Sequence, residues 1–222
     1  MPQLHPSAPR LRRAVPPGLL SLVLALVLAL GLPPGLTLGQ SSALGAGTGH
    51  AAPPAAAFPD LPLELSAQNA VALGLGAGGS TSLSRIPAQG LLVLLMSYFC
   101  PPCHKEIPRI KDLERRIRDR GLAGRIRMVA LAAGDDQALV ERFKTRHGGL
   151  PFALVPDPAL AAHKRLGSPV VPTLYSVASS GGKLRLLNTQ EGEFDEDPDA
   201  FLDALLRALP APHGTAKASP RK

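Results

Sequence analysis

The strongest constraint on the fold is an unbroken apolar run at residues 91–96, Leu-Leu-Val-Leu-Leu-Met, which follows Gly90. An apolar run of this length is typical of a strand that is buried on both faces of a sheet. From residue 102 to residue 120, apolar side chains then recur at the spacing of one helix face: Ile107, Ile110, Leu113 and Ile117. The sequence therefore predicts a central strand that leads directly into a long amphipathic helix.

Strands and helices are predicted to alternate along the rest of the chain. We expect an apolar edge segment at 61–65, strands at 126–132 and 152–155, helices at 136–147 and 158–165, a hairpin of 173–178 with 183–188, and a last helix at 198–209. Ser179-Ser180-Gly181-Gly182 supplies the hairpin turn. This order predicts the α/β fold class, as a three-layer α/β/α sandwich around a central mixed sheet.

The positive net charge belongs to the ends of the chain. The formal net charge is +7, but residues 58–209 carry 18 Lys and Arg against 17 Asp and Glu. A nucleic-acid-binding surface needs several uncompensated cations on one face. The nearly neutral body therefore argues against a nucleic-acid partner.

An export segment is predicted at residues 1–32, where Arg10, Arg12 and Arg13 precede the apolar run 19–32. As a helix, this run would span about 21 Å, which is less than the roughly 30 Å of a bilayer core and favours a cleaved signal peptide. The alternative is an uncleaved membrane anchor, with residues 19–32 as the tether. Either form places the body in the periplasm or at the extracytoplasmic face of the membrane.

The predicted body, residues 58–209, is flanked by segments of biased composition. Residues 33–57 are mostly Gly, Ala, Pro, Ser and Thr, and they bury too little apolar surface to offset the entropy of ordering. We interpret them as a linker. Residues 210–222 are expected to be a disordered basic tail.

Two cysteines lie where the buried strand becomes the helix, in Cys100-Pro101-Pro102-Cys103. A thiol at a helix start lies at the positive end of the peptide dipoles, which favour the thiolate over the thiol. Pro101 and Pro102 have no N–H, so the amide of Cys103 is the local donor to the Cys100 sulfur. We therefore interpret Cys100 as the exposed, attacking thiol and Cys103 as the resolving thiol, with the two prolines tuning the pair.

Two other roles of the cysteine pair stay open. A permanent disulfide would close so short a loop that it restrains the unfolded chain little. A metal site needs two more ligands, and the histidines at positions 5, 50, 104, 147, 163 and 213 show no paired spacing on one helix. Reversible redox exchange is the favoured interpretation, and no cofactor or resident metal is expected.

A strand, Cys-Pro-Pro-Cys, a helix with Pro108, and a downstream Val171-Pro172-Thr173 before a strand and hairpin together resemble the thioredoxin superfamily. The export segment and the additional strand and helix between residues 152 and 165 are similar to its TlpA/ResA branch of periplasmic disulfide reductases. The resemblance covers about residues 58–209. It implies a thioredoxin-like fold for this body.

The resemblance also implies four substrate-binding positions: Phe99, Val171, Pro172 and Thr173. The peptide bond before Pro172 is expected to be cis, with the proline against the disulfide. The backbone of Val171 is expected to align the substrate strand. Phe99 stands where the family usually has Trp, so we expect apolar packing at the site without an indole N–H.

The proton acceptor of the family is missing. Thioredoxins place a buried Asp six residues before the first cysteine, where this chain has Leu94. Cys103 must still lose its proton before a mixed disulfide resolves, to water, to Glu106 or to another residue. We expect Glu106 to be a solvated helix residue. His104, one turn after Cys100, is expected to lie on the same helix face and to tune the site by favouring the thiolate.

These observations predict an exported thiol:disulfide oxidoreductase that reduces disulfides of extracytoplasmic proteins, with cytochrome c maturation as one such pathway. Its expected partners are disulfide-containing exported proteins and a membrane or periplasmic electron donor. The alternative is a copper-binding metallochaperone of thioredoxin-like fold, which would use Cys100, Cys103 and a histidine. A peroxiredoxin is disfavoured because the sequence has no Thr-x-x-Cys motif.

Overall fold

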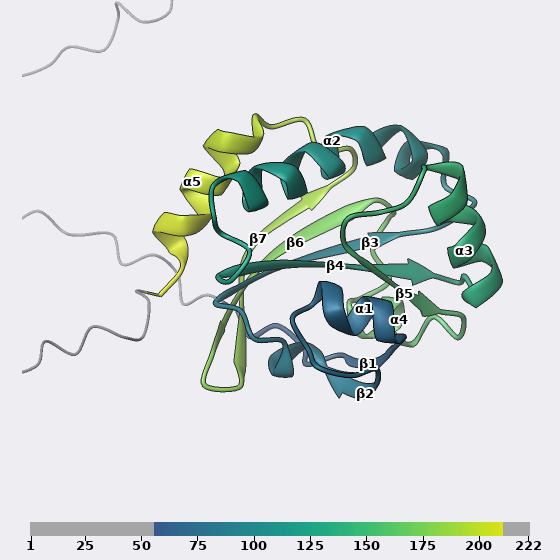
Figure 1. Cartoon of the computed structure of the whole chain (residues 1–222), viewed down its shortest axis with the longest axis horizontal. Helices are drawn as coiled ribbons and strands as arrows, with labels where there is room; N and C mark the ends of the chain where they lie inside the picture. Colours follow the sequence, from purple (N-terminus) through teal and green to yellow (C-terminus); the bar gives the residue numbers. More distant parts are fainter. Residues whose placement is uncertain (1–55, 211–222) are drawn as a thin grey trace, which may run out of the picture. The chain divides into compact units, whose positions relative to one another are not determined.

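The structure, a computed structural model, describes residues 56–210 (Figure 1). The predicted export segment 1–32 lies outside the described residues, as do most of the predicted linker 33–57 and nearly all of the tail 210–222. Within the described range, no helix is both long enough and apolar enough to span a bilayer.

Five strands form one mixed sheet in the order β5-β4-β3-β6-β7. They are β3 (Gly90–Met96), β4 (Ile126–Ala133), β5 (Ala153–Asp157), β6 (Thr173–Ser180) and β7 (Lys183–Glu191). β3 pairs in parallel with β4, and β4 with β5, whereas β6 runs antiparallel to β3 and β7 antiparallel to β6. All seven residues of β3 are buried. The predicted central strand and mixed sheet are confirmed.

Three helices cover one face of the sheet: α2 (Pro101–Asp119), α3 (Gln137–Arg146) and α5 (Pro198–Ala208). From β3 this face presents Leu92, Leu94 and Met96, which share one core with the buried side of α2. That side contains the four residues expected from their spacing: Ile107, Ile110, Leu113 and Ile117. In Figure 1, α2 crosses the sheet with α5 at one end and α3 at the other.

Smaller elements cover the opposite face, where β3 presents Leu91, Val93 and Leu95. They are α1 (Ala67–Ala72), α4 (Ala161–Arg165), and a two-stranded sheet of β1 (Pro62–Leu65) and β2 (Gly79–Ser82), followed by a 3-10 turn at Leu83–Arg85. The α/β/α sandwich is therefore confirmed (Figure 1). The sequence did not predict α1 or β2, because a six-residue helix is too short to show a clear period and Gly-Ser-Thr-Ser has no apolar alternation.

The β6–β7 hairpin has a tighter turn than expected. Its strands extend to Ser180 and Lys183, which pair with each other and leave only Gly181 and Gly182 in the turn. The φ angles of these two glycines are 57° and 76°. Two successive positive φ angles are what a two-residue hairpin turn requires, and glycine adopts them without a steric cost.

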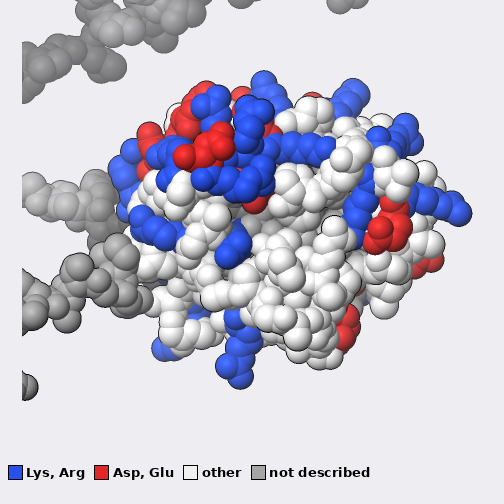
Figure 2. Space-filling model, in the orientation of Figure 1, with Lys and Arg blue, Asp and Glu red and all other residues white. Residues whose placement is uncertain are grey.

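Opposite charges are interleaved on α2 and α5. Arg116 lies 2.8 Å from the carboxylate of Asp199, and Arg120 lies 2.5 Å from that of Asp203. Figure 2 shows Lys and Arg side chains mixed with Asp and Glu over these two helices. This part of the surface therefore presents no patch of a single sign.

Strand pairing places the two segments of the site next to each other. β3 ends at Met96, four residues before Cys100, and β6 begins at Thr173, directly after Pro172. Leu95 and Thr173 are partners in the register between these two strands. The antiparallel pairing thus brings the end of β3 and the start of β6 to the same edge of the sheet.

Candidate active site

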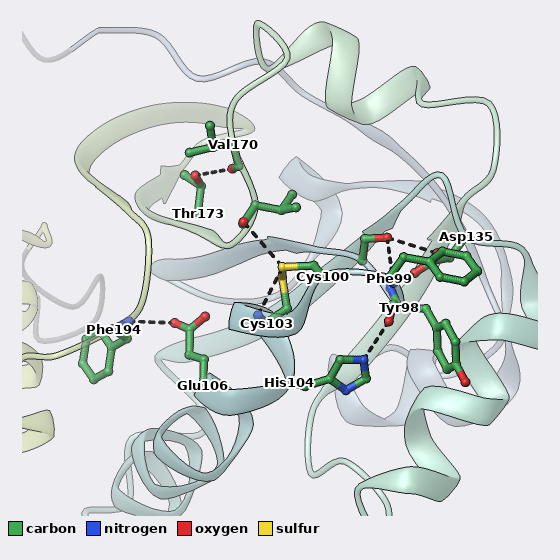
Figure 3. The surroundings of a disulfide bond; sticks show 12 residues. Tyr98, Phe99, Cys100, Cys103, His104, Glu106, Asp135, Val170, Thr173 and Phe194 are labelled. Atoms are coloured by element: carbon green, nitrogen blue, oxygen red, sulfur yellow. Dashed lines mark hydrogen bonds between the residues drawn. A yellow bond between two sulfur atoms is a disulfide. The ribbon is translucent and has the colours of Figure 1, made fainter. Parts of the chain in front are cut away.

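Cys100 is the N-cap residue of α2 and is bonded to Cys103 in a disulfide (Figure 3). Pro101 and Pro102 occupy the first turn, where missing N–H groups cost the helix nothing. The amide N–H of Cys103 points at the Cys100 sulfur from 3.1 Å. This is the local donor that the sequence predicted, and it sits where the helix dipole favours a negative charge.

The pair is more enclosed than expected. Cys100 is 7% exposed and Cys103 is 1% exposed, so only an edge of Cys100 reaches the surface. The prediction of an exposed Cys100 therefore holds only relative to Cys103. The order of access still follows the predicted roles, because a substrate sulfur can approach Cys100 and cannot approach Cys103.

The segment before β6 covers the disulfide. The Val171–Pro172 peptide bond is cis, as expected. The carbonyl oxygen of Val171 lies 3.5 Å from the Cys100 sulfur, so the backbone at this position borders the reactive atom. This geometry is compatible with the predicted alignment of a substrate strand by Val171.

Thr173 lies in the interior rather than at the substrate surface. Its side chain is fully buried, and its hydroxyl donates a 2.7 Å hydrogen bond to the carbonyl of Val170 (Figure 3). The predicted substrate-binding role of Thr173 therefore stays a prediction for its backbone alone. Instead, Thr173 closes the turn that carries Val171 and Pro172.

Two exposed apolar side chains accompany the disulfide. Phe99, which precedes Cys100, is 73% exposed, and Val170, which precedes Val171, is 62% exposed. The ring of Phe99 makes an edge contact with Tyr98, at 5.1 Å between centroids. Phe99 therefore does not pack into the site as expected but offers an apolar surface to solvent beside Cys100.

Glu106 corrects a second prediction. It was expected to be solvated, but it is 3% exposed, and its carboxylate accepts a 3.0 Å hydrogen bond from the N–H of Phe194. Burial raises the pKa of Glu106 to about 7, the Phe194 N–H opposes this rise, and nearby Glu193 adds to it. Glu106 follows Cys103 by three positions, so both lie on one side of α2 (Figure 3). That spacing was the signal in the sequence for a buried acid beside the resolving thiol.

Leu94 belongs to the same core cluster as Cys103 and is 1% exposed. The position that holds an acid in thioredoxins is therefore apolar. The buried acid of this region, Glu106, lies on helix α2 instead of on the strand. The site keeps a buried carboxyl, but a different element supplies it.

His104 contacts the backbone that leads to Cys100. One ring nitrogen lies 2.7 Å from the carbonyl oxygen of Tyr98, and the other lies 2.8 Å from a ring nitrogen of His147. The amide of Tyr98 donates to the carboxylate of Asp135 at 2.6 Å. The sequence indicated His104 as a tuning residue but gave no sign of its partners Asp135 and His147.

A third metal ligand is not found near the cysteines in the described part of the chain. Across residues 56–210, no group of three His, Cys, Asp or Glu side chains is arranged to hold a metal ion. His104 is hydrogen-bonded to His147 and to the carbonyl of Tyr98. The metallochaperone alternative thus gains no support from this part of the structure.

Comparisons with known proteins agree with this geometry. The sequence model of the AhpC/TSA family matches residues 55–185. One curated relative is the thiol-disulfide oxidoreductase ResA of Halalkalibacterium halodurans, which is 27% identical over 104 residues, or 47% of this chain and 56% of the relative. The chain thus spans about half the length of that relative.

Two solved structures share the architecture. A candidate thiol:disulfide interchange protein DsbE from Chlorobium tepidum has a TM-score of 0.53 and 17% identity, over 70% of this chain and 96% of the other. A candidate thioredoxin from Neisseria meningitidis has a TM-score of 0.50 and 23% identity, over 69% of this chain and 89% of the other. The fold of residues 56–210 is therefore thioredoxin-like.

Proposed function

Because the chain belongs to the AhpC/TSA family, whose model matches more than half of its length, we propose that it is a thiol:disulfide oxidoreductase that works through Cys100 and Cys103. One observation carries this proposal: the Cys100 sulfur caps α2, is bonded to Cys103, and borders the carbonyl of Val171. This arrangement gives one sulfur with access to a partner and a second sulfur that can displace that partner.

In the reducing direction, the thiolate of Cys100 attacks one sulfur of a substrate disulfide. The substrate S–S bond breaks, a mixed disulfide forms, and the departing substrate thiolate takes a proton from water. Cys103 then loses its proton and attacks the Cys100 sulfur, which releases the second substrate thiolate. The substrate gains two electrons, and the Cys100–Cys103 disulfide is restored.

Glu106 is the proposed acceptor of the Cys103 proton. Its pKa of about 7 allows it to be ionised before the transfer and protonated after it at near-neutral pH. It lies one turn beyond Cys103 on the buried side of α2, in the same interior. A carboxyl held in this way replaces the acid that is absent at Leu94.

The substrate is proposed to be an extended segment of an exported protein. Such a segment would lie against the backbone of Val171 and against Phe99 and Val170, which present apolar surface beside the only reachable sulfur. Oxidised chain would be reduced again by a membrane or periplasmic electron donor. Export through residues 1–32 is inferred from the sequence. The resemblance of the sequence to the TlpA/ResA branch motivates the reducing direction, with cytochrome c maturation as one pathway.

The proposal is tested by trapping. The full chain with Cys103→Ser is expressed in an exporting cell, and adducts of Cys100 are isolated under non-reducing conditions and identified. We expect mixed disulfides with exported proteins that are absent from a matched Cys100→Ser chain. Equal recovery from both variants, or none from either, would overturn the proposal.

The direction of exchange is tested separately on purified wild-type chain. The disulfide is equilibrated with glutathione buffers, and a reduction potential toward the thioredoxin value of about −270 mV is expected. A potential near −120 mV would reverse the proposed direction and indicate an oxidase. Titration of the reduced chain with Cu(I) in the same preparation would support the metallochaperone if one ion bound tightly and a His104 variant lost it.

A further inference from the structure

The backbone of Tyr98 is held at both its N–H and its carbonyl. Its N–H donates to the Asp135 carboxylate at 2.6 Å, and its carbonyl oxygen lies 2.7 Å from a ring nitrogen of His104 (Figure 3). Asp135 also accepts the hydroxyl of Ser97 at 3.2 Å. These contacts fix the backbone between the end of β3 and the start of α2, two residues before Cys100.

His104 and His147 form a hydrogen-bonded pair with fixed roles. A carbonyl oxygen only accepts, so the Nε2 of His104 that faces Tyr98 must carry a proton. In the neutral ring, the Nδ1 of His104 is then an acceptor, and the Nε2 of His147 donates to it across 2.8 Å. Phe143, which is buried, stacks on the His104 ring at 4.7 Å between centroids and lies tilted against the His147 ring at 4.6 Å.

This geometry lets the pair hold one extra proton but not two. The extra proton fits on the outer nitrogen of His147, which leaves the contact between the rings intact. A second extra proton would have to bind Nδ1 of His104, which would place its N–H against the N–H of His147 at 2.8 Å. The charged neighbours of the pair are Asp135, which precedes α3, Lys111, whose ammonium donates to the carbonyl of His147, and Arg146.

The cations oppose protonation at the outer end of the pair. Burial lowers the pKa of His147, and His104, Lys111 and Arg146 lower it further. The pair is therefore suited to a mechanical role in which its hydrogen bonds matter more than its charge.

We propose that His104 and His147 are positioning residues, which hold the Tyr98 carbonyl and thereby keep Phe99 and Cys100 at the start of α2 when the disulfide is open. In the oxidised chain, the bond to Cys103 already fixes Cys100. Reduction removes this covalent tie. Cys100 is then held by non-covalent contacts alone. These are the Cys103 N–H on its sulfur, its own backbone hydrogen bonds to Ser97 and His104, and the preceding backbone that Asp135 and His104 hold.

The consequence is a selective effect on the reduced form. A loosened Tyr98 peptide lets the Cys100 thiolate leave the helix N-terminus, and the reduced state loses stability relative to the disulfide. This inference rests on the proposed function only in that the disulfide opens and closes. Its readouts concern the cysteine pair itself, so they stand even if trapping identifies no substrate.

The test uses three single variants, the double variant of His104→Phe with His147→Phe, and one control, all in the full chain. His104→Phe removes the anchor of Tyr98, whereas His104→Gln keeps an N–H that can reach the same carbonyl. His147→Phe removes the donor to His104 but keeps a ring against Phe143. Arg142→Gln alters an exposed residue of the same helix α3 and serves as the matched control.

Two quantities are measured for each variant: thiolate absorbance at 240 nm against pH, and the equilibrium between dithiol and disulfide in glutathione buffers. We expect His104→Phe to shift that equilibrium about threefold to tenfold toward the disulfide and to lower the thiolate fraction at pH 6. His147→Phe should shift the equilibrium and the thiolate fraction in the same direction, but by a smaller amount. The double variant should show the same values as His104→Phe alone. His104→Gln should restore most of the wild-type values, and Arg142→Gln should match them.

Unfolding of the oxidised chain by urea separates positioning from general stability. The same measurement is made on the reduced chain. The proposal requires that His104→Phe lowers the free energy of unfolding more in the reduced chain than in the oxidised chain. Equal losses in both, additive effects of the two histidine variants, or wild-type equilibria in His104→Phe would overturn it. If His104→Phe does not fold, His147→Phe is compared with His104→Gln. The proposal then requires that His147→Phe shifts the equilibrium toward the disulfide and destabilises the reduced chain more than the oxidised chain, while His104→Gln stays close to wild type.

Discussion

The carboxylate of Glu106 accepts a 3.0 Å hydrogen bond from the backbone N–H of Phe194. The guanidinium of Arg109 donates to the carbonyl of the same residue at 3.1 Å, so two side chains of α2 hold the backbone of Phe194 in the segment before α5. The contact keeps Glu106 out of water, one turn beyond Cys103. A residue that the helical pattern left among the polar positions thus becomes a buried acid of the site.

Glu106→Gln should slow the resolution of mixed disulfides. The amide can still accept from Phe194, so the local structure is kept, but it cannot take a proton from Cys103. General base catalysis typically contributes about 10²- to 10⁴-fold, and we expect a loss of at least tenfold near pH 7. Stopped-flow measurement of substrate thiol release from a preformed mixed disulfide checks this.

Glu114→Gln is the matched control for this variant. Glu114 lies on the same helix, and burial raises its pKa to about 7 as well, against the influence of Arg118 and Arg127. Eleven residues of helix place it about 16 Å from Cys103. Resolution in this variant should match wild type, and a similar loss in both variants would argue against Glu106 as the proton acceptor.

The stability of the oxidised chain should fall as pH rises from about 4.5 to 7. The folded forms of Glu106 and Glu114 have pKa values near 7 against an ordinary 4.5, so the folded state binds more protons than the unfolded state in this window. Each carboxyl contributes a slope of at most about 1.4 kcal/mol per pH unit, and the slope vanishes above the folded values. Urea unfolding across pH 4 to 8 measures it, and either Gln variant should flatten the curve. A curve that rises through the same window would contradict the assignment.

Phe99→Ser should weaken the reduction of protein disulfides. The ring is 73% exposed, so its loss should change the free energy of unfolding by less than about 0.5 kcal/mol. A substrate segment that covers the ring would lose about 1 to 2 kcal/mol of apolar burial, roughly a fivefold to thirtyfold drop in kcat/KM. Insulin serves as the protein substrate, and a small aromatic disulfide, which cannot cover the ring, should react at the wild-type rate.

Val71→Ser provides the comparison for Phe99→Ser. Val71 is 69% exposed, but it lies on α1, which covers the opposite face of the sheet from α2. Its replacement should leave insulin reduction unchanged. If both variants lose activity equally, the effect is not specific to the surface beside Cys100.

Thr173→Val should destabilise the fold by about 1 kcal/mol, because the 2.7 Å hydrogen bond to the Val170 carbonyl is lost while the side-chain shape is kept. The loosened turn should also lower kcat/KM for insulin severalfold through displacement of Val171. Thr189→Val, at an exposed position of β7, is the control. Identical unfolding midpoints of the two variants would show that the Thr173 hydroxyl does not hold the turn.

Much of the fold could be predicted because its signals are local. The buried β3 follows from a continuous apolar run, α2 from a helical stripe and a Pro-rich first turn, and the β6–β7 hairpin from paired glycines. The short α1 and the polar β2 gave no comparable period. They are stabilised by packing on the sheet rather than by their own pattern.

The sequence by itself determined that two thiols would meet at the start of a helix, because three residues of helical turn bring Cys100 and Cys103 together whatever surrounds them. Only the tertiary structure decided what surrounds them. Phe194, which buries Glu106, is 88 residues away, His147 is 43 residues from its partner His104, and Val171 is 71 residues from Cys100. Whether a polar side chain is buried or solvated depends on whether a distant segment displaces its water and replaces the lost hydrogen bonds. A local sequence pattern contains no information about that distant segment.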